Sequence, residues 1–178
     1  MALKNTTESY GWLAKLFHWS IAILLVGLVY AGLTFNGMER GPERSELAAL
    51  HKSVALLTLL LMTGRLLWKF ANPSPVDPPG TASWQRTAAK LTHWLLYAAV
   101  YFQLTIGILV SGQRSFGFFG LFEIPPLLEE NHDQHELFEE LHAWGWKILA
   151  ALVTVHVLAT LYHHFRLKDD VLRRMTTQ

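Results

Sequence analysis

Residues 141–165 read LHAWGWKILAALVTVHVLATLYHHF, and this stretch decides the fold of the chain. It is almost wholly apolar and long enough to cross a bilayer as an α-helix. His142 and His156 are 14 residues apart within it. On a helix this separation is within about 40° of whole turns and spans about 21 Å of rise, so both imidazoles lie on one face at two depths. Ionisable side chains are rare inside membranes and usually serve a function, so the stretch predicts a membrane helix with functional sites at two levels.

Three further apolar blocks of similar length occur in this chain of 178 residues, of which 51% are hydrophobic and only 16% are charged. The apolar blocks predict transmembrane helices near residues 13–35, 48–70, 88–111 and 141–165. We therefore expect a single membrane domain over residues 1–178, an all-α transmembrane four-helix bundle with up-down-up-down topology. Its main partner is membrane lipid, and no nucleic-acid partner is expected. Residues 1–10 are polar and are expected to be frayed.

The charged residues predict which side of the membrane holds the chain ends. Nine Lys and Arg residues lie at the termini and the second connection, against four around the first and third connections. By the positive-inside rule, both termini are cytoplasmic. The nine are Lys4, Lys15, Lys69, Arg86, Lys90, Arg166, Lys168, Arg173 and Arg174. The third connection instead carries seven Asp and Glu residues between positions 123 and 140, which makes it an acidic outer loop.

Histidines at matching heights on different helices indicate the chemistry of the bundle. With both termini inside, His18 and His156 lie near the cytoplasmic side, whereas His51 and His142 lie near the outer side. Two cross-helix pairs at two levels are what two bis-histidine b-type haems stacked in a four-helix bundle require. The chain has no cysteine, so a redox centre here is held non-covalently. His93 lies at the height of His18, and geometry alone leaves open His93 with His156 or His18 with His93 as the lower pair.

Two sequence patterns recur between the halves of the chain. The motif AKLxHW at residues 14–19 returns at 89–94, and LH at 50–51 returns at 141–142. This repetition indicates that the two helical hairpins are related by duplication.

As a set, several motifs resemble the bacterial cytochrome b-561 family of four-helix, di-haem membrane proteins, and the likeness covers nearly the whole chain. These motifs are FHW (17–19), LHK (50–52), RLLW (65–68), HWLLY (93–97), LH (141–142), His156, HHF (163–165) and KDDVLRRM (168–175), with a proline-rich connector after RLLW. The resemblance implies a bacterial inner-membrane protein with two haem b groups. It implies that His18 and His156 bind the cytoplasmic-side haem and that His51 and His142 bind the outer one. His93 is then a non-ligand neighbour.

Two further residues are candidates beside the lower haem. Arg65 lies 14 residues after His51, so it shares that helix face at the depth of the cytoplasmic haem. There it would pair with a haem propionate, and snorkelling to the lipid interface is the alternative. His163 lies seven residues after His156, near the same helix stripe, and is a candidate to pass a proton to a bound quinone. No residue is assigned as catalytic beyond these candidates, His163, His93 and Arg65.

The expected function is electron transfer between the quinone pool, ubiquinone or another quinone, and a donor or acceptor at the outer, periplasmic face. A small periplasmic redox protein and superoxide are candidate partners, and a homodimer is a further expectation. Some members of the resembled family oxidise superoxide, but we place this second because an acidic outer loop repels an anion. Two further alternatives are a cytochrome b anchor subunit of a larger dehydrogenase and a non-haem metal-binding membrane protein. The metal alternative would use His132 and His135, which we interpret as solvated, with a short amphipathic helix from residue 127 running into the fourth membrane helix.

Overall fold

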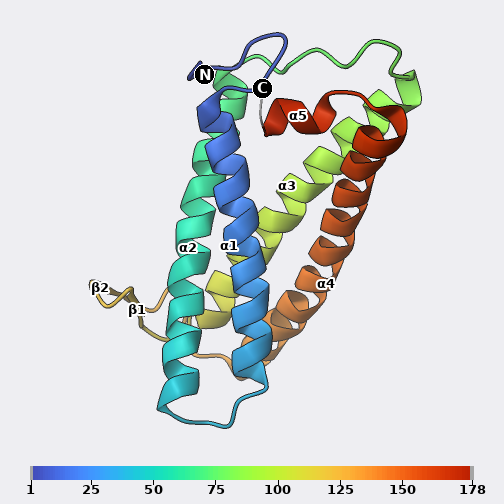
Figure 1. Ribbon diagram of the computed structural model, residues 1–178. Helices are drawn as coiled ribbons and strands as arrows, with labels where there is room; N and C mark the ends of the chain where they lie inside the picture. Colours follow the sequence, from blue (N-terminus) through green and yellow to red (C-terminus); the bar gives the residue numbers. More distant parts are fainter. Residues whose placement is uncertain (1, 177–178) are drawn as a thin grey trace.

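The computed structural model describes residues 2–176. Four long helices run alternately up and down the bundle, and both chain ends lie at the same end of it (Figure 1). They are α1 (Trp12–Asn36), α2 (Pro42–Ala71), α3 (Ser83–Ser111) and α4 (His132–Tyr162). All four are long and apolar enough to cross a membrane, so the expected all-α four-helix bundle is confirmed.

The helices are longer than the apolar blocks that predicted them. A helix of 30 residues, such as α2, is about 45 Å long, whereas the hydrocarbon layer is only about 30 Å thick. The extra turns lie in polar sequence, where local capping favours them. α2 begins at Pro42, a residue suited to the first helical turn. α4 begins at His132, and the Asn131 side chain caps it by accepting a hydrogen bond from the Gln134 backbone at 3.0 Å.

The bundle is built from two hairpins. α1 packs on α2, α3 packs on α4, and the hairpins are joined by packing of α2 on α3. They spread apart toward the end that carries the termini (Figure 1). The buried core includes Ile21, Leu28, Met62, Tyr97 and Leu104. Large apolar side chains such as Ile23, Leu60 and Leu158 instead cover the outer surface, as expected of helices that face lipid.

A small β-hairpin follows α3 at the end away from the termini and lies beside α2 (Figure 1). Its antiparallel strands are β1 (Phe116–Phe118) and β2 (Phe122–Ile124). Phe119 and Gly120 form the turn with φ angles of 50° and 71°, which is unusual for a phenylalanine. Ser53 of α2 holds the hairpin, because its hydroxyl donates to Gly117 O at 3.2 Å and accepts from Phe119 N at 3.0 Å.

Both chain termini and the proline-rich connector meet in a cap over the other end of the bundle. After α4 the chain continues as a π-helix, η1 (His163–Leu167), and a short helix, α5 (Val171–Met175). Asn5 Nδ2 donates to Pro73 O at 2.9 Å, and Trp19 Nε1 donates to Met175 O at 2.9 Å. The expectation of a frayed start is therefore wrong for residues 2–10, which are hydrogen-bonded to the connector. Burial in this cap raises the pKa of Tyr10 above its ordinary value.

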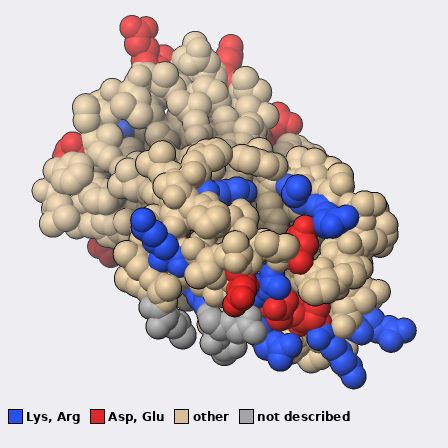
Figure 2. All heavy atoms as spheres, turned by 90° about the horizontal axis from the view of Figure 1, so that it is seen from above, with Lys and Arg blue, Asp and Glu red and all other residues tan. Residues whose placement is uncertain are grey.

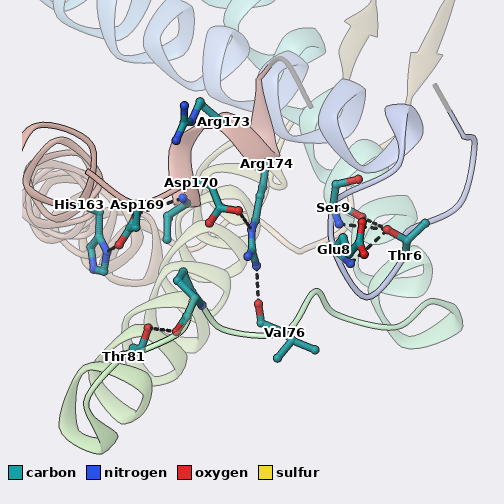
Figure 3. Close-up of polar contacts among 12 residues, drawn as sticks. Thr6, Glu8, Ser9, Val76, Thr81, His163, Asp169, Asp170, Arg173 and Arg174 are labelled. Atoms are coloured by element: carbon teal, nitrogen blue, oxygen red, sulfur yellow. Dashed lines mark hydrogen bonds and ion pairs between the residues drawn. The ribbon is translucent and has the colours of Figure 1, made fainter. Parts of the chain in front are cut away.

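Arg174 links three parts of the cap (Figure 3). It lies in α5, forms an ion pair with Asp170 at 2.9 Å and donates to the Val76 carbonyl of the connector. The Val76 backbone N–H in turn donates to Thr7 O at 2.9 Å, so the start, middle and end of the chain are connected. Lys and Arg side chains gather over this end of the molecule, with some Asp and Glu among them (Figure 2).

Replacing Arg174 with alanine is expected to loosen the cap. The side chain is largely buried, so its loss leaves Asp170 and the Val76 carbonyl without this partner and costs about 1–3 kcal/mol of folding free energy. Thermal unfolding followed by circular dichroism should show a lower Tm. Arg173→Ala is the matched control because its neighbouring side chain is exposed, and equal effects of the two variants would contradict the role of Arg174.

Candidate functional site

Three histidines and one arginine meet in the half of the bundle nearer the cap. The ring centroids of His18 on α1 and His156 on α4 are 6.3 Å apart. Those of His93 on α3 and His156 are 5.4 Å apart. Arg65 Nη2 on α2 lies 3.0 Å from His18 Nδ1. A guanidinium only donates, so His18 Nδ1 accepts in this contact and Nε2 carries the ring proton.

The second histidine pair lies in the half of the bundle nearer the β-hairpin. The ring centroids of His51 on α2 and His142 on α4 are 6.5 Å apart. Each ring also faces a glycine of a neighbouring helix. A Cβ atom added to Gly32 on α1 would lie 3.4 Å from His51 Cε1, and one added to Gly107 on α3 would lie 2.9 Å from His142 Cε1. The second contact is shorter than a real Cβ atom makes, so a side chain at position 107 would force the His142 ring to shift.

The two glycines occupy equivalent positions in the sequence repeat. Gly32 follows His18 by 14 residues, and Gly107 follows His93 by 14 residues. In the same way, Arg65 follows His51 by 14 residues and His156 follows His142 by 14. Arg65 therefore takes in the first hairpin the place that His156 takes in the second. The repeat explains why three histidines and one arginine, instead of four histidines, meet at the lower level.

Both histidine pairs line one continuous cavity of about 2240 Å³ that runs along the bundle between α1 and α4. Pockets for single drug-sized ligands are usually about 300–1,000 Å³, so this cavity has room for more than one such group. Most of its remaining lining is apolar, for example Ile21, Leu25 and Leu149. Neutral imidazoles in an apolar cavity are suitable ligands for a soft or borderline metal and for the iron of haem.

Gln103 is a site residue that the sequence analysis missed. Its side chain is buried on α3, and its amide nitrogen lies 3.1 Å and 3.2 Å from the two ring nitrogens of His142. The same nitrogen donates to His142 O at 3.2 Å. Gln103 is the counterpart of Leu28 in the repeat, so a polar residue stands where the first hairpin has an apolar one. The available signal was that Gln103 carries the one amide side chain in the apolar stretch 94–110 of α3.

The remaining sequence candidates lie at the two ends of α4. His163 Nδ1 lies 2.5 Å from Asp169 Oδ2, and both side chains are mostly buried beneath the cap (Figure 3). His132 and His135 are in the first turns of α4, so the helix expected to run into the fourth membrane helix is present but begins at residue 132 instead of 127. The His132 side chain is exposed to solvent, as expected. The two histidines pair with Glu136 and Glu139 at 3.3 Å each. Within residues 2–176, no group of three or more His, Asp or Glu side chains is arranged to hold a metal ion.

The histidine pairs fit a haem held by two imidazoles. Metal–imidazole bonds of about 2 Å on both sides place the two ring centroids roughly 6 Å apart, and the observed separations are 6.3 Å and 6.5 Å. The two glycines leave space for the imidazoles of His51 and His142 against the backbones of α1 and α3. His51 Nδ1 is buried without a hydrogen-bond partner in the described part of the chain, so its lone pair or proton is not committed to another protein group.

Comparison with known proteins agrees with this chemistry. The family described as prokaryotic cytochrome b561 matches residues 9–178. The chain is similar to cytochrome b561 homolog 2 of Escherichia coli (strain K12), at 32% identity over 98% of this chain and 95% of that protein. It is also similar to cytochrome b561 homolog 1 of the same organism, at 31% identity over 89% of this chain and 91% of that protein.

A third relative carries an enzymatic name. The probable superoxide oxidase CybB of Yersinia pestis is 26% identical over 94% of this chain and 96% of its own length. The family match covers almost the whole chain, including every histidine discussed above. Membership of this family implies a b-type haem in a multi-pass membrane protein. The chain belongs to the prokaryotic cytochrome b561 family.

Proposed function

We propose that this membrane cytochrome holds two b-type haems and moves electrons between the quinone pool and a donor or acceptor at the opposite membrane face. The observation that carries the proposal is the pair of cross-hairpin histidine contacts, at 6.3 Å and 6.5 Å, within one cavity. In this proposal His18 and His156 hold the haem nearer the cap, and His51 and His142 hold the other. Bound haem supplies reversible one-electron chemistry, because iron with two imidazole ligands has no open position for a substrate.

The residues around the lower pair have supporting roles in this proposal. Arg65 supplies a positive charge for a haem propionate, and the apolar cavity lining excludes water. In the structure Arg65 donates to His18 Nδ1, which leaves the ring proton on Nε2. For His18 to hold a haem through Nε2, that proton would have to move to Nδ1, and Arg65 would then leave Nδ1. The acidic partner of His163, Asp169, would keep that imidazole oriented for proton transfer beside the quinone.

The orientation in the bacterial inner membrane is part of the same proposal. The cap contains most of the Lys and Arg residues outside the membrane helices, which supports a cytoplasmic location for both termini. The quinone site is then near the cytoplasmic haem, and the histidine pair beside the β-hairpin faces the periplasm.

The purified protein tests the proposal directly. A reduced-minus-oxidised absorption spectrum should show a b-type haem, and a pyridine haemochrome assay should count two haems per chain. Decylubiquinol should then reduce the haem. One haem per chain would contradict the two-site proposal, and two haems that decylubiquinol does not reduce would contradict the link to quinone.

Superoxide oxidation is a second candidate, and one observation favours it. Arg44, Lys52 and Arg114 line the cavity at the end away from the cap, although the loop around them is acidic. Lys52 is half-buried, and its Nζ lies 5.8 Å from the centroid of the Phe116 ring. Cations that line a cavity focus the electric field and attract anions. Haem reduction by superoxide at rates that fall when Lys52 becomes Met would support this candidate.

His93→Ala tests the choice of lower ligands. We expect two haems per chain to remain, since His93 is assigned as a neighbour and His18 pairs with His156 at a separation close to that of the other pair. The measurement is the haem-to-protein ratio of the purified variant. Loss of one haem would show that His93, 5.4 Å from His156, is the ligand instead of His18.

A further inference from the structure

Two cations and two aromatic rings are gathered between α2 and α3 near the cap. Lys69 Nζ lies 4.5 Å from the centroid of the Trp94 ring and 4.9 Å from that of Tyr97. The Arg65 guanidinium carbon lies 5.5 Å from the same Tyr97 ring. Both cations therefore contact aromatic faces, which attract positive charge. All four residues line the cavity that contains the histidine pairs.

The two cations lack a carboxylate partner. Ion pairs within residues 2–176 involve Arg114, Arg174 and three histidines, and none includes Lys69 or Arg65. A cation in a membrane helix normally pairs with another group or reaches the lipid head groups. Arg65 contacts His18 and is expected to meet a propionate, but Lys69 is half-buried against two rings. Lys69 is therefore available to an electronegative ligand in the cavity.

Trp68 adds a second unused donor. Its indole N–H is buried and has no hydrogen-bond partner in the part of the chain that the structure describes. The residue also lines the cavity. An indole N–H is only a donor, so an acceptor oxygen is what it lacks. Trp68 and Lys69 follow Arg65 by three and four residues, so all three side chains lie on one side of α2. Trp68 and Lys69 are about one helical turn nearer the cap than Arg65.

We propose that Lys69 and Trp68 bind a carbonyl oxygen of a quinone head group whose ring lies against Trp94 and Tyr97. This inference rests on the proposed quinone-linked function and locates its binding site. Both a quinone carbonyl and a haem propionate can accept from these two donors, but only a quinone also has a flat ring that fits aromatic neighbours and an apolar tail that needs access to lipid. Trp94 lines the cavity, and its ring centroid lies 6.3 Å from that of Phe70, which is 69% exposed and does not line the cavity, so the cavity wall reaches the outer surface of the bundle at this point.

The test uses haem-loaded protein in lipid nanodiscs. Oxidised decylubiquinone is titrated while tryptophan fluorescence reports binding, and decylubiquinol is varied while haem absorbance reports the apparent KM for reduction. Lys69→Met should raise both the Kd and the apparent KM about tenfold or more, because a charged hydrogen bond is lost. Trp68→Phe should raise both about threefold, because it removes only a neutral donor. Lys69→Arg should retain most of the affinity.

The chain offers a matched control in Lys147→Met. Lys147 Nζ lies 4.5 Å from the centroid of the Trp144 ring, the same type of contact, but both side chains are exposed on α4. This variant should leave Kd and apparent KM unchanged. Haem content and the dithionite-reduced spectrum should match wild type in all variants.

The outcomes separate this inference from the proposed function. Unchanged quinone affinity in both Lys69→Met and Trp68→Phe would overturn the inference and leave the function standing. Loss of haem from Lys69→Met at unchanged quinone affinity would overturn it too, and would make Lys69 a propionate partner. If decylubiquinol does not reduce wild-type haem, the quinone-linked function fails, whereas weaker binding of oxidised decylubiquinone to Lys69→Met would still support the site.

Discussion

Replacing His156 with alanine is expected to remove the haem nearer the cap and to leave the other haem bound. The ring centroid of His156 lies 6.3 Å from that of His18 and 5.4 Å from that of His93, so His156 is the shared member of both of these contacts. Without it, neither remaining histidine has a facing partner on α4. The other pair, His51 and His142, does not involve this side chain.

The haem-to-protein ratio of the His156→Ala variant should fall from two to one, and a redox titration should show one midpoint potential. His164→Ala is the control, because the ring of His164 contacts Phe165 and not one of the proposed ligand residues. An unchanged ratio of two haems would remove His156 from the ligand set. Loss of both haems with intact helical content would show that the two sites are coupled.

Replacing Gly107 with valine should have the next largest effect on haem content, at the haem proposed between His51 and His142. Even the first atom of a new side chain would lie 2.9 Å from His142 Cε1, and valine adds two methyl groups beyond it. Overpacking of this kind costs about 1–3 kcal/mol when the backbone and side chains have to shift. His142 would be displaced from His51, so we expect the content of the outer haem to fall strongly while the haem held by His156 remains.

The repeat supplies the control for this variant. Gly32 holds the same place in the first hairpin, but a Cβ atom there would lie 3.4 Å from His51 Cε1, which is an ordinary contact. Gly32→Ala should therefore retain two haems, and Gly107→Ala should show a smaller loss than Gly107→Val. Equal haem content in Gly107→Val and wild type would contradict the close packing of His142 against Gly107 of α3.

The fold and the heights of the histidines were predictable because both follow from helix geometry. As helices, the four apolar blocks are each long enough to cross a bilayer, and in lipid an apolar segment has few alternatives to a helix. A separation of 14 residues fixes face and depth together, and for this reason His142 and His156 lie on the cavity side of α4 at two levels. The contact between Arg65 and the lower level follows from the same spacing after His51.

Periodicity did not predict features that depend on the lateral position of the hairpins. The close approach of Gly107 to His142 arises from the packing of α3 on α4. The same packing brings the Gln103 amide into contact with the His142 ring, which the sequence of α3 alone does not predict. Lys69 appeared in the sequence as one of nine positive charges, whereas the structure places its Nζ against the rings of Trp94 and Tyr97. Its role depends on contacts with α3, which a single-helix pattern does not contain.

The cap was missed for a different reason. Residues 2–10 are polar and carry no helical or strand period, so sequence alone predicts disorder for them. Asn5 and Thr7 are hydrogen-bonded to Pro73 and Val76 of the connector, which are more than 60 residues away in the chain. Long-range backbone bonds of this kind leave no local sequence signal.

The position of α5 has a consequence for how the protein matures. Trp19 Nε1 donates to Met175 O, and Arg174 donates to the connector, so α5 fastens the first membrane helix and the connector together. In the chain α5 follows all four membrane helices, and its residues line the cavity. We therefore expect the four membrane helices to be synthesised and inserted before α5 can close this end of the cavity, which gives the cofactor a time window for entry.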